Sequence, residues 1–225
     1  QCILVIIGAK ADGTKELIAV EDGFRESKES WQSIIRELKR RGLILGPELA
    51  IGDGALGFWA AIAEEFPNTK TQLCWVHKTA NVLDKLPSSI QGKAKKMIHD
   101  IYLPPTKQDA NVAFDIFIAE FDWKYPQAVE SLRSKRQELM SFYDFPAEQW
   151  QHIRSTNVIE STFATVRLRT KRTKGCGSRI ATLTMVFKLV ESAEKRWKKL
   201  RGYRKISQLL EGVQFQDGIA LQQAA

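Results

Sequence analysis

The stretch Leu49-Ala50-Ile51-Gly52-Asp53-Gly54 decides how this chain is interpreted, because a short apolar run ends at a carboxylate between two glycines. An apolar run of this length bounded by turn residues predicts a buried strand. In an open α/β sheet, ligands collect just beyond the strand ends near a topological switch. Asp53 is therefore a candidate for chemistry. The alternative is that Asp53 only caps the following helix, since Asp is a favoured N-cap residue.

Strand and helix signals alternate over the first 77 residues. The expected elements are strands at residues 2–8, 16–20, 49–51 and 71–75 and helices at residues 27–41 and 55–65. Asp12-Gly13 lies between the first two strands, where this dipeptide is typical of a hairpin turn. The order predicts an α/β fold with a mixed sheet, because a hairpin opens it and helices separate the later strands.

Residues 78–150 show helical periodicity and no convincing strand pattern. We expect helices at residues 94–102, 108–121 and 125–142, and further helices at residues 156–174 and 179–200. The sequence therefore predicts a core made from two separated parts, residues 1–77 and 151–225. An all-helical insertion at residues 78–150 lies between them.

Positive charge is concentrated in the last third of the sequence. The formal net charge is +8, and residues 151–205 hold fifteen Lys or Arg against three acids. Residues 1–150 carry slightly more acids than bases. A basic segment on an otherwise balanced chain predicts a polyanionic partner, of which nucleic acid is the simplest. The alternative is a solvated helical face without a partner.

Glu160 has two interpretations. The run Asn157-Val158-Ile159-Glu160 matches a capping box, with Asn157 at the N-cap and Glu160 at the third helical position. Glu160 also shares one face of the predicted helix with Arg167, Lys171 and Lys174. A metal-binding Glu beside a nucleic-acid backbone requires such basic side chains, because they neutralise phosphates on both sides of the scissile bond. Asp53 and Glu160 then supply two carboxylates of a two-metal phosphoryl-transfer site.

Cys74 and His77 lie at the end of the last expected strand of the first part, in a Cys-x-x-His pattern. They supply two of the four ligands that a structural zinc site needs, and the other Cys and His residues form no matching second half. We expect instead a supporting role, in which the thiol and the imidazole hydrogen-bond the loop that carries Asp53. Trp59 and Trp75 fit buried packing better than stacking on an unpaired base.

Composition argues against several classes of protein. No apolar run reaches the ~18 residues that cross a bilayer, and residues 2–7 are too short for a secretory signal and lack a basic flank. Three cysteines do not make a disulfide framework, which favours a reducing cytoplasm. Gly175-Cys176-Gly177 lacks the ending of a phosphate-binding loop, and Cys176 has no adjacent base that would activate it as a nucleophile.

Several segments in order give the chain a family resemblance. Residues 52–59, 72–81, 156–163 and 167–178 resemble the signature blocks of Mutator-type bacterial insertion-sequence transposases. The resemblance spans nearly the whole chain. It implies a ribonuclease H-like catalytic domain whose Asp-Asp-Glu triad binds two divalent ions, Mg²⁺ or Mn²⁺. In it, Asp53 matches the second Asp, Glu160 matches the Glu, and Cys74 and His77 match the family's Cys/Asp-x-x-His motif.

The resemblance also implies an activity. Such an enzyme cleaves DNA at the ends of an insertion sequence and joins the freed 3′-hydroxyl to target DNA. The implied partners are terminal-repeat and target DNA and further copies of the chain, in the bacterial cytoplasm at the nucleoid and without a membrane. The residues expected to contact phosphates are Arg167, Arg169, Lys171, Arg172, Lys174 and Arg179.

The sequence departs from the family pattern at its start. In the family, the first Asp lies on the first, central strand. This chain begins with a strand, at Cys2, that matches the family's second strand. We therefore expect an N-terminal truncation. Asp12 lies at the wrong end of its strand to replace that residue. Because Mg²⁺ relies on few protein ligands in strict geometry, the missing carboxylate predicts that this chain is inactive. The neighbouring strands also lose a central hydrogen-bonding partner, so we expect the chain to be unstable alone. Two alternatives remain open, a non-catalytic DNA-binding remnant and a ribonuclease H-like nuclease unrelated to transposition.

Overall fold

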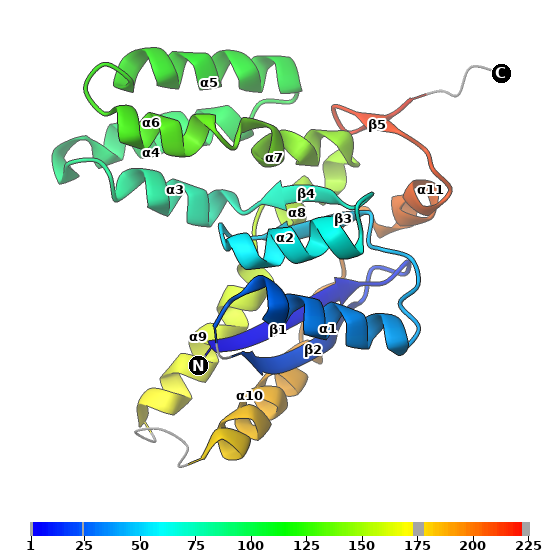
Figure 1. Ribbon diagram of the computed structural model, residues 1–225. Helices are drawn as coiled ribbons and strands as arrows, with labels where there is room; N and C mark the ends of the chain where they lie inside the picture. Colours follow the sequence, from blue (N-terminus) through cyan, green and yellow to red (C-terminus); the bar gives the residue numbers. More distant parts are fainter. Residues whose placement is uncertain (1, 24, 173–177, 222–225) are drawn as a thin grey trace. The chain divides into compact units, whose positions relative to one another are not determined.

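The computed structural model describes residues 2–23, 25–172 and 178–221. The protein is mixed α/β with a predominance of helix, and the strands in these ranges form two-stranded sheets only (Figure 1). The chain divides into two compact units. The first unit comprises residues 1–50, 55–69 and 156–211, and the second comprises residues 51–54, 70–155 and 212–225.

Strands and helices alternate early in the chain, and helices follow. In chain order the elements are β1 (Cys2–Ala9), β2 (Lys15–Gly23), α1 (Lys28–Arg40), β3 (Leu49–Gly52), α2 (Leu56–Glu65), β4 (Lys70–Leu73), α3 (Trp75–Leu83), α4 (Ser88–Tyr102), α5 (Lys107–Phe121), α6 (Pro126–Arg133), α7 (Arg136–Met140), η1 (Ser141–Asp144), η2 (Ala147–Gln149), α8 (Trp150–Ile153), α9 (Asn157–Arg172), α10 (Arg179–Glu194), η3 (Tyr203–Lys205), α11 (Ile206–Leu210), β5 (Phe215–Gln216) and β6 (Ile219–Ala220).

A β-hairpin organises the first unit. Strands β1 and β2 pair antiparallel with one register shift. The predicted turn between them is present, because Gly13 has φ +81° and the Thr14 N–H donates to Asp12 Oδ1 at 2.9 Å. The left-handed region favours glycine, which explains why Gly13 occupies this position.

Helices cover both faces of this hairpin. Helices α1 and α2 pack on one face around Leu4, and α9 and α10 pack on the other, where Val186 and Val190 are fully buried (Figure 1). Successive strand residues point to opposite faces, so the neighbours Ile3 and Leu4 belong to different apolar clusters. The first unit is therefore built in three layers, with the hairpin in the middle.

The second unit combines short strands with a small helical bundle. Strands β3 and β4 form one pair, and β5 and β6 form another. Helices α3 to α6 pack around aromatic side chains, including the fully buried Phe114 and Phe117. All of residues 78–150 are described and none lies in a strand, so the helical character expected there is confirmed.

A buried amide joins β4 to the helical part of the second unit. Gln72 Oε1 accepts the N–H of Phe142 at 2.8 Å, and Gln72 Nε2 donates to the main-chain oxygens of Leu73 and Leu139 at 2.8 and 3.1 Å. Trp75 Nε1 donates to the same Leu139 oxygen at 2.9 Å. Buried polar groups require such partners, and these bonds hold α7 beside β4.

Several predicted elements have different bounds. The strand expected at residues 71–75 ends at Leu73, because the Trp75 N–H bonds to Arg154 O at 2.9 Å and α3 begins there. The single helix expected at residues 125–142 is α6, α7 and the 3-10 helix η1. The helix expected at residues 179–200 ends at Glu194. Within the described ranges β1–β2 and β3–β4 are separate pairs, so the continuous mixed sheet is not present; no ladder joins β1 or β2 to β3.

Candidate functional site

Asp53 lies immediately after β3 in the second unit. The oxygen of the preceding residue, Gly52, accepts the Cys74 N–H at 2.7 Å. This bond joins the end of β3 to the residue that follows β4. The structure therefore brings the half-buried Asp53 and the buried Cys74 to one edge of the small sheet.

Cys74 and His77 occupy the start of α3 in the same unit. Cys74 is the N-cap residue, and its side chain is buried. His77 lies in the first turn and is half-buried. Residues three apart share a helix face, so both side chains belong to one face of α3 beside the β3 end.

Arg154 supports this edge and was not singled out from the sequence. Its main-chain oxygen accepts the Trp75 N–H, and its Nη1 donates to the Tyr102 oxygen at 2.5 Å. The guanidinium carbon lies 5.1 Å from the Tyr102 ring centroid and 5.6 Å from that of Phe142. Burial lowers the pKa of Arg154. No periodicity or motif marks this residue, because its contacts come from parts of the chain distant in sequence.

Glu160 lies in the first unit, in the first turn of α9. The Thr156 hydroxyl donates to Glu160 Oε1 at 2.9 Å. Helix α9 begins at Asn157, so Asn157 is its first helical residue and Thr156 occupies the position before it. A carboxylate in the first turn also interacts favourably with the helix dipole.

The basic residues of α9 lie on its exposed side. Arg167, Arg169 and Lys171 are exposed, whereas Thr162 and Val166 are buried. The side chain of Arg172 and all of Lys174 lie outside the described part of the chain, as does Cys176. The exposed Arg167, Arg169 and Lys171 form a cationic surface on the helix, of the kind that binds phosphate groups.

Arg179, the last of the predicted phosphate ligands, is paired within the chain. Its guanidinium makes an ion pair with Asp22 and donates from Nη2 to Oδ1 at 2.7 Å. The hydrogen bond from Arg179 lowers the pKa of Asp22, and Asp22 raises the pKa of Arg179. A phosphate must therefore compete with this carboxylate.

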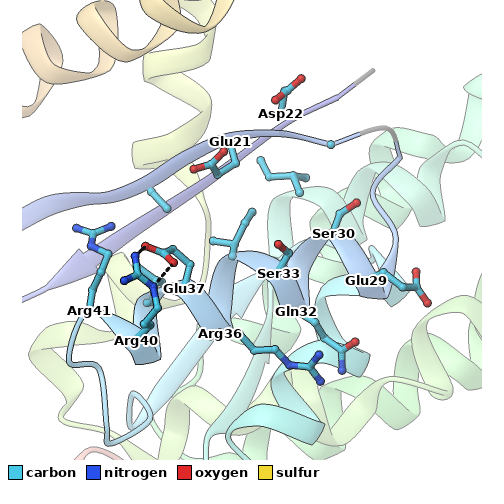
Figure 2. Close-up of a pocket in the computed structure, with 15 residues that line it drawn as sticks. Glu21, Asp22, Glu29, Ser30, Gln32, Ser33, Arg36, Glu37, Arg40 and Arg41 are labelled. Carbon is cyan, nitrogen blue, oxygen red and sulfur yellow. Dashed lines mark hydrogen bonds and ion pairs between the residues drawn. The ribbon is translucent and has the colours of Figure 1, made fainter.

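A hollow of about 790 Å³ in the first unit is lined in part by Asp22 but not by Asp53, Cys74, His77 or Glu160. It lies between β2 and α1 and is lined by acidic, basic and hydroxyl side chains (Figure 2). Arg40 donates two hydrogen bonds to Glu37, of 2.7 and 2.8 Å. Arg36 donates a hydrogen bond to Glu65, which does not line the hollow. Arg36, Glu37 and Arg40 are thus engaged in ion pairs, and we place the candidate chemistry at the strand ends and not in this hollow.

Comparison with known proteins identifies the family. A profile described as "Transposase, Mutator family" matches residues 1–200. The chain belongs to the Mutator family of transposases. The resemblance found in the signature segments is thereby confirmed.

Two transposases illustrate how similar members of this family are to the chain. The transposase for insertion sequence element IST2 of Acidithiobacillus ferrooxidans is 55% identical over 97% of the chain and 74% of its own length. The transposase for insertion sequence element IS6120 of Mycolicibacterium smegmatis is 50% identical over 98% of the chain and 68% of its own length. Both Mutator relatives are longer than the matched region.

The transposase chain shows no helix, within its described residues, that is both long and apolar enough to cross a membrane. Asp53, Cys74 and His77 lie in one unit of this family member, and Glu160 and the exposed bases of α9 lie in the other.

Proposed function

We propose that Asp53 and Glu160 are metal-binding carboxylates of a ribonuclease H-like DNA transposase. The proposed reaction is hydrolysis of a phosphodiester bond at the ends of an insertion sequence, followed by attack of the freed 3′-hydroxyl on target DNA. The observation that carries the proposal is the Gly52–Cys74 hydrogen bond, because it holds Asp53 beside the Cys-x-x-His turn at one sheet edge. The family membership supplies the substrate class.

The donor chemistry of these residues fits Mg²⁺ or Mn²⁺. Carboxylate oxygens are the ligands that these hard cations prefer. Both carboxylates are half-buried, so a bound ion would be partly screened from water. Two such ions, held by these carboxylates, would supply activation of the attacking oxygen and stabilisation of the leaving oxygen.

The remaining residues have supporting roles. Thr156 orients Glu160 through the 2.9 Å hydroxyl bond. The main-chain bond from Cys74 fixes the loop before Asp53, and Arg154 fixes the first residue of α3. Such supporting hydrogen bonds set the orientation of a ligand.

DNA contact is assigned to the basic helices. The exposed Arg167, Arg169 and Lys171 follow Glu160 along α9, so phosphates bound there would continue away from the carboxylate. Phosphate neutralisation makes such binding weaken as salt rises. We place the protein in the bacterial cytoplasm with DNA as its partner.

The test uses the full-length product of the gene with Glu160→Gln and Asp53→Asn. We expect each change to abolish cleavage of DNA carrying the element ends while binding at fixed salt is retained. Glu191→Gln is the matched control, because this half-exposed acid on α10 pairs with Lys188 in a surface contact. Its activity should match that of the unmodified protein.

Other outcomes separate the alternative functions. Loss of binding together with cleavage in Glu160→Gln would make Glu160 a structural cap. Salt-sensitive binding without cleavage in the unmodified protein would indicate a DNA-binding remnant. Hydrolysis without strand transfer would indicate a nuclease unrelated to transposition.

A further inference from the structure

Helix α5 carries an exposed apolar stripe on the side opposite its buried aromatic residues. Val112 is 55% exposed, Ile116 is 56% exposed and Trp123 is 81% exposed, and Ala119 between them is also exposed. Trp123 follows the end of the helix, but Asp122 keeps helical dihedral angles, so the helical path continues to it. We call Val112, Ile116, Ala119 and Trp123 the α5 stripe.

The stripe is a continuous line along one face of the helix. Its members are separated by four, three and four residues, which is the spacing that keeps side chains on one side of an α-helix. The other side of α5 is already used, since Ala110, Phe114 and Phe117 are fully buried against the neighbouring helices. An exposed apolar line of this kind marks a site of protein contact.

The spacing is the same when the chain direction is reversed. If a second α5 runs antiparallel, Val112 of one copy faces Trp123 of the other, and Ile116 faces Ala119. Each contact then occurs twice, as in a two-fold interface where one surface patch serves both subunits. Each pair also joins a larger side chain to a smaller one, which suits close packing of two helices.

Acidic side chains beside the stripe are paired with basic side chains of the same chain, and Lys124 Nζ lies 5.8 Å from the Trp123 ring centroid. Asp115 bonds to Arg136 at 2.6 Å, Glu120 pairs with Lys93, and Asp122 pairs with Arg133. Two identical faces can therefore approach without strong like-charge repulsion. The same pairing disfavours nucleic acid as the occupant, because these three cations are already engaged by carboxylates.

We propose that the α5 stripe is a homodimer interface, in which α5 of a second copy of this chain packs antiparallel to the first. This inference names a surface for the self-association expected of a transposase, and it does not depend on Asp53 or Glu160. It is tested without DNA or divalent metal, so its outcome is independent of whether the chain cleaves DNA.

The first measurement is sedimentation equilibrium of the 225-residue chain and of Ile116→Glu. We expect a dimer for the chain and at least roughly tenfold weaker dimerisation for the variant, because it buries an unpaired carboxylate. Ile219→Glu is the matched control, since Ile219 is 71% exposed in β6 of the same unit and lies outside the stripe. Circular dichroism verifies that both variants are folded. A monomeric unmodified chain, or equal weakening by both variants, would overturn the proposal.

The second measurement determines the direction of the pairing by mild oxidation of variants that add one cysteine to a Cys2→Ser, Cys176→Ser background, in which the remaining Cys74 is buried. In the antiparallel pair the two copies of residue 119 lie only ~4.5 Å apart along the axis, whereas the two copies of residue 112 lie ~16 Å apart. A disulfide needs Cα atoms within about 7 Å. Ala119→Cys should therefore cross-link, and Val112→Cys and the exposed α3 control Ala80→Cys should not. Equal cross-linking of Val112→Cys would contradict the antiparallel interface.

Discussion

Arg154 and Tyr102 join the end of α8 to the end of α4, with Arg154 Nη1 donating to the Tyr102 main-chain oxygen at 2.5 Å. The carbonyls at the end of a helix have no partner within the helix, and a guanidinium supplies one here. Because Arg154 O also accepts the Trp75 N–H, one residue fixes the end of α4 and the start of α3.

Replacing Arg154 by Gln should loosen the end of α4. A hydrogen bond from a charged donor contributes about 1.5–3 kcal/mol, so we expect a destabilisation of this order. Hydrogen exchange measured by mass spectrometry should show faster exchange in the peptide that contains residues 99–103. Arg133→Gln is the control, because the ion pairs of Arg133 with Asp122 and Glu130 are exposed. Equal protection in both variants would show that the Arg154 contact is unimportant for this segment.

Removing the Thr156 hydroxyl should impair catalysis more than folding. Thr156→Val deletes the 2.9 Å bond to Glu160, and loss of a bond that orients a metal ligand costs roughly tenfold to a hundredfold in activity. Cleavage by the full-length protein measures the effect, and Thr156→Ser should restore it. A Thr156→Val protein with unchanged cleavage would argue against a role for this bond in positioning Glu160.

Replacing Asp22 by Asn should strengthen DNA binding. Asp22 now pairs with Arg179, and its removal makes that guanidinium available to a phosphate. One additional phosphate contact should steepen the dependence of log K on log salt by about 0.9. Binding of a duplex across a salt series measures the slope. The double variant Asp22→Asn, Arg179→Gln should lose the gain; if it retains the gain, Arg179 is not responsible.

The hairpin turn should respond to acid below pH 4. Hydrogen bonds from the Thr14 side chain and main chain lower the pKa of Asp12 from 3.8 to about 2. Because the folded-state pKa is depressed, the stabilisation is complete above the unfolded value of 3.8 and is lost as the pH falls towards 2. An NMR titration of the Asp12 carboxyl measures this pKa, and Thr14→Val should raise it. A titration midpoint near 3.8 in the unmodified chain would contradict the expectation.

Much of the fold follows from local sequence patterns. The Asp12-Gly13 turn, helix α1 and the helical character of residues 78–150 are encoded by turn chemistry and periodicity. The start of α3 was not predictable, because Leu73-Cys74-Trp75 continues an extended apolar pattern and the bond that ends it comes from Arg154. Local signals contain no information about such a distant partner.

The sequence predicted the residue types of the candidate site and their positions near strand ends, but not the contacts around them. Asp53 and Cys74 were placed at strand ends, and the bond between Gly52 and Cys74 joins those ends. The Asp22–Arg179 pair links residues 157 positions apart, and no spacing rule relates them. No Gly or Pro interrupts Arg133-Ser134-Lys135-Arg136, so no local breaker predicts the break between α6 and α7.

Gln72 has a consequence for how the chain tolerates changes in length. Its amide bonds to main-chain groups of Leu73, Leu139 and Phe142 as a further stretch of backbone would. Inserting or deleting a residue between Leu139 and Phe142 would misalign these bonds, and no rotation of one side chain would restore all of them. Gln72 does not constrain the turns between α3 and α6 in this way. Insertions or deletions in the helical bundle can therefore be accommodated in those turns while β4 remains unchanged.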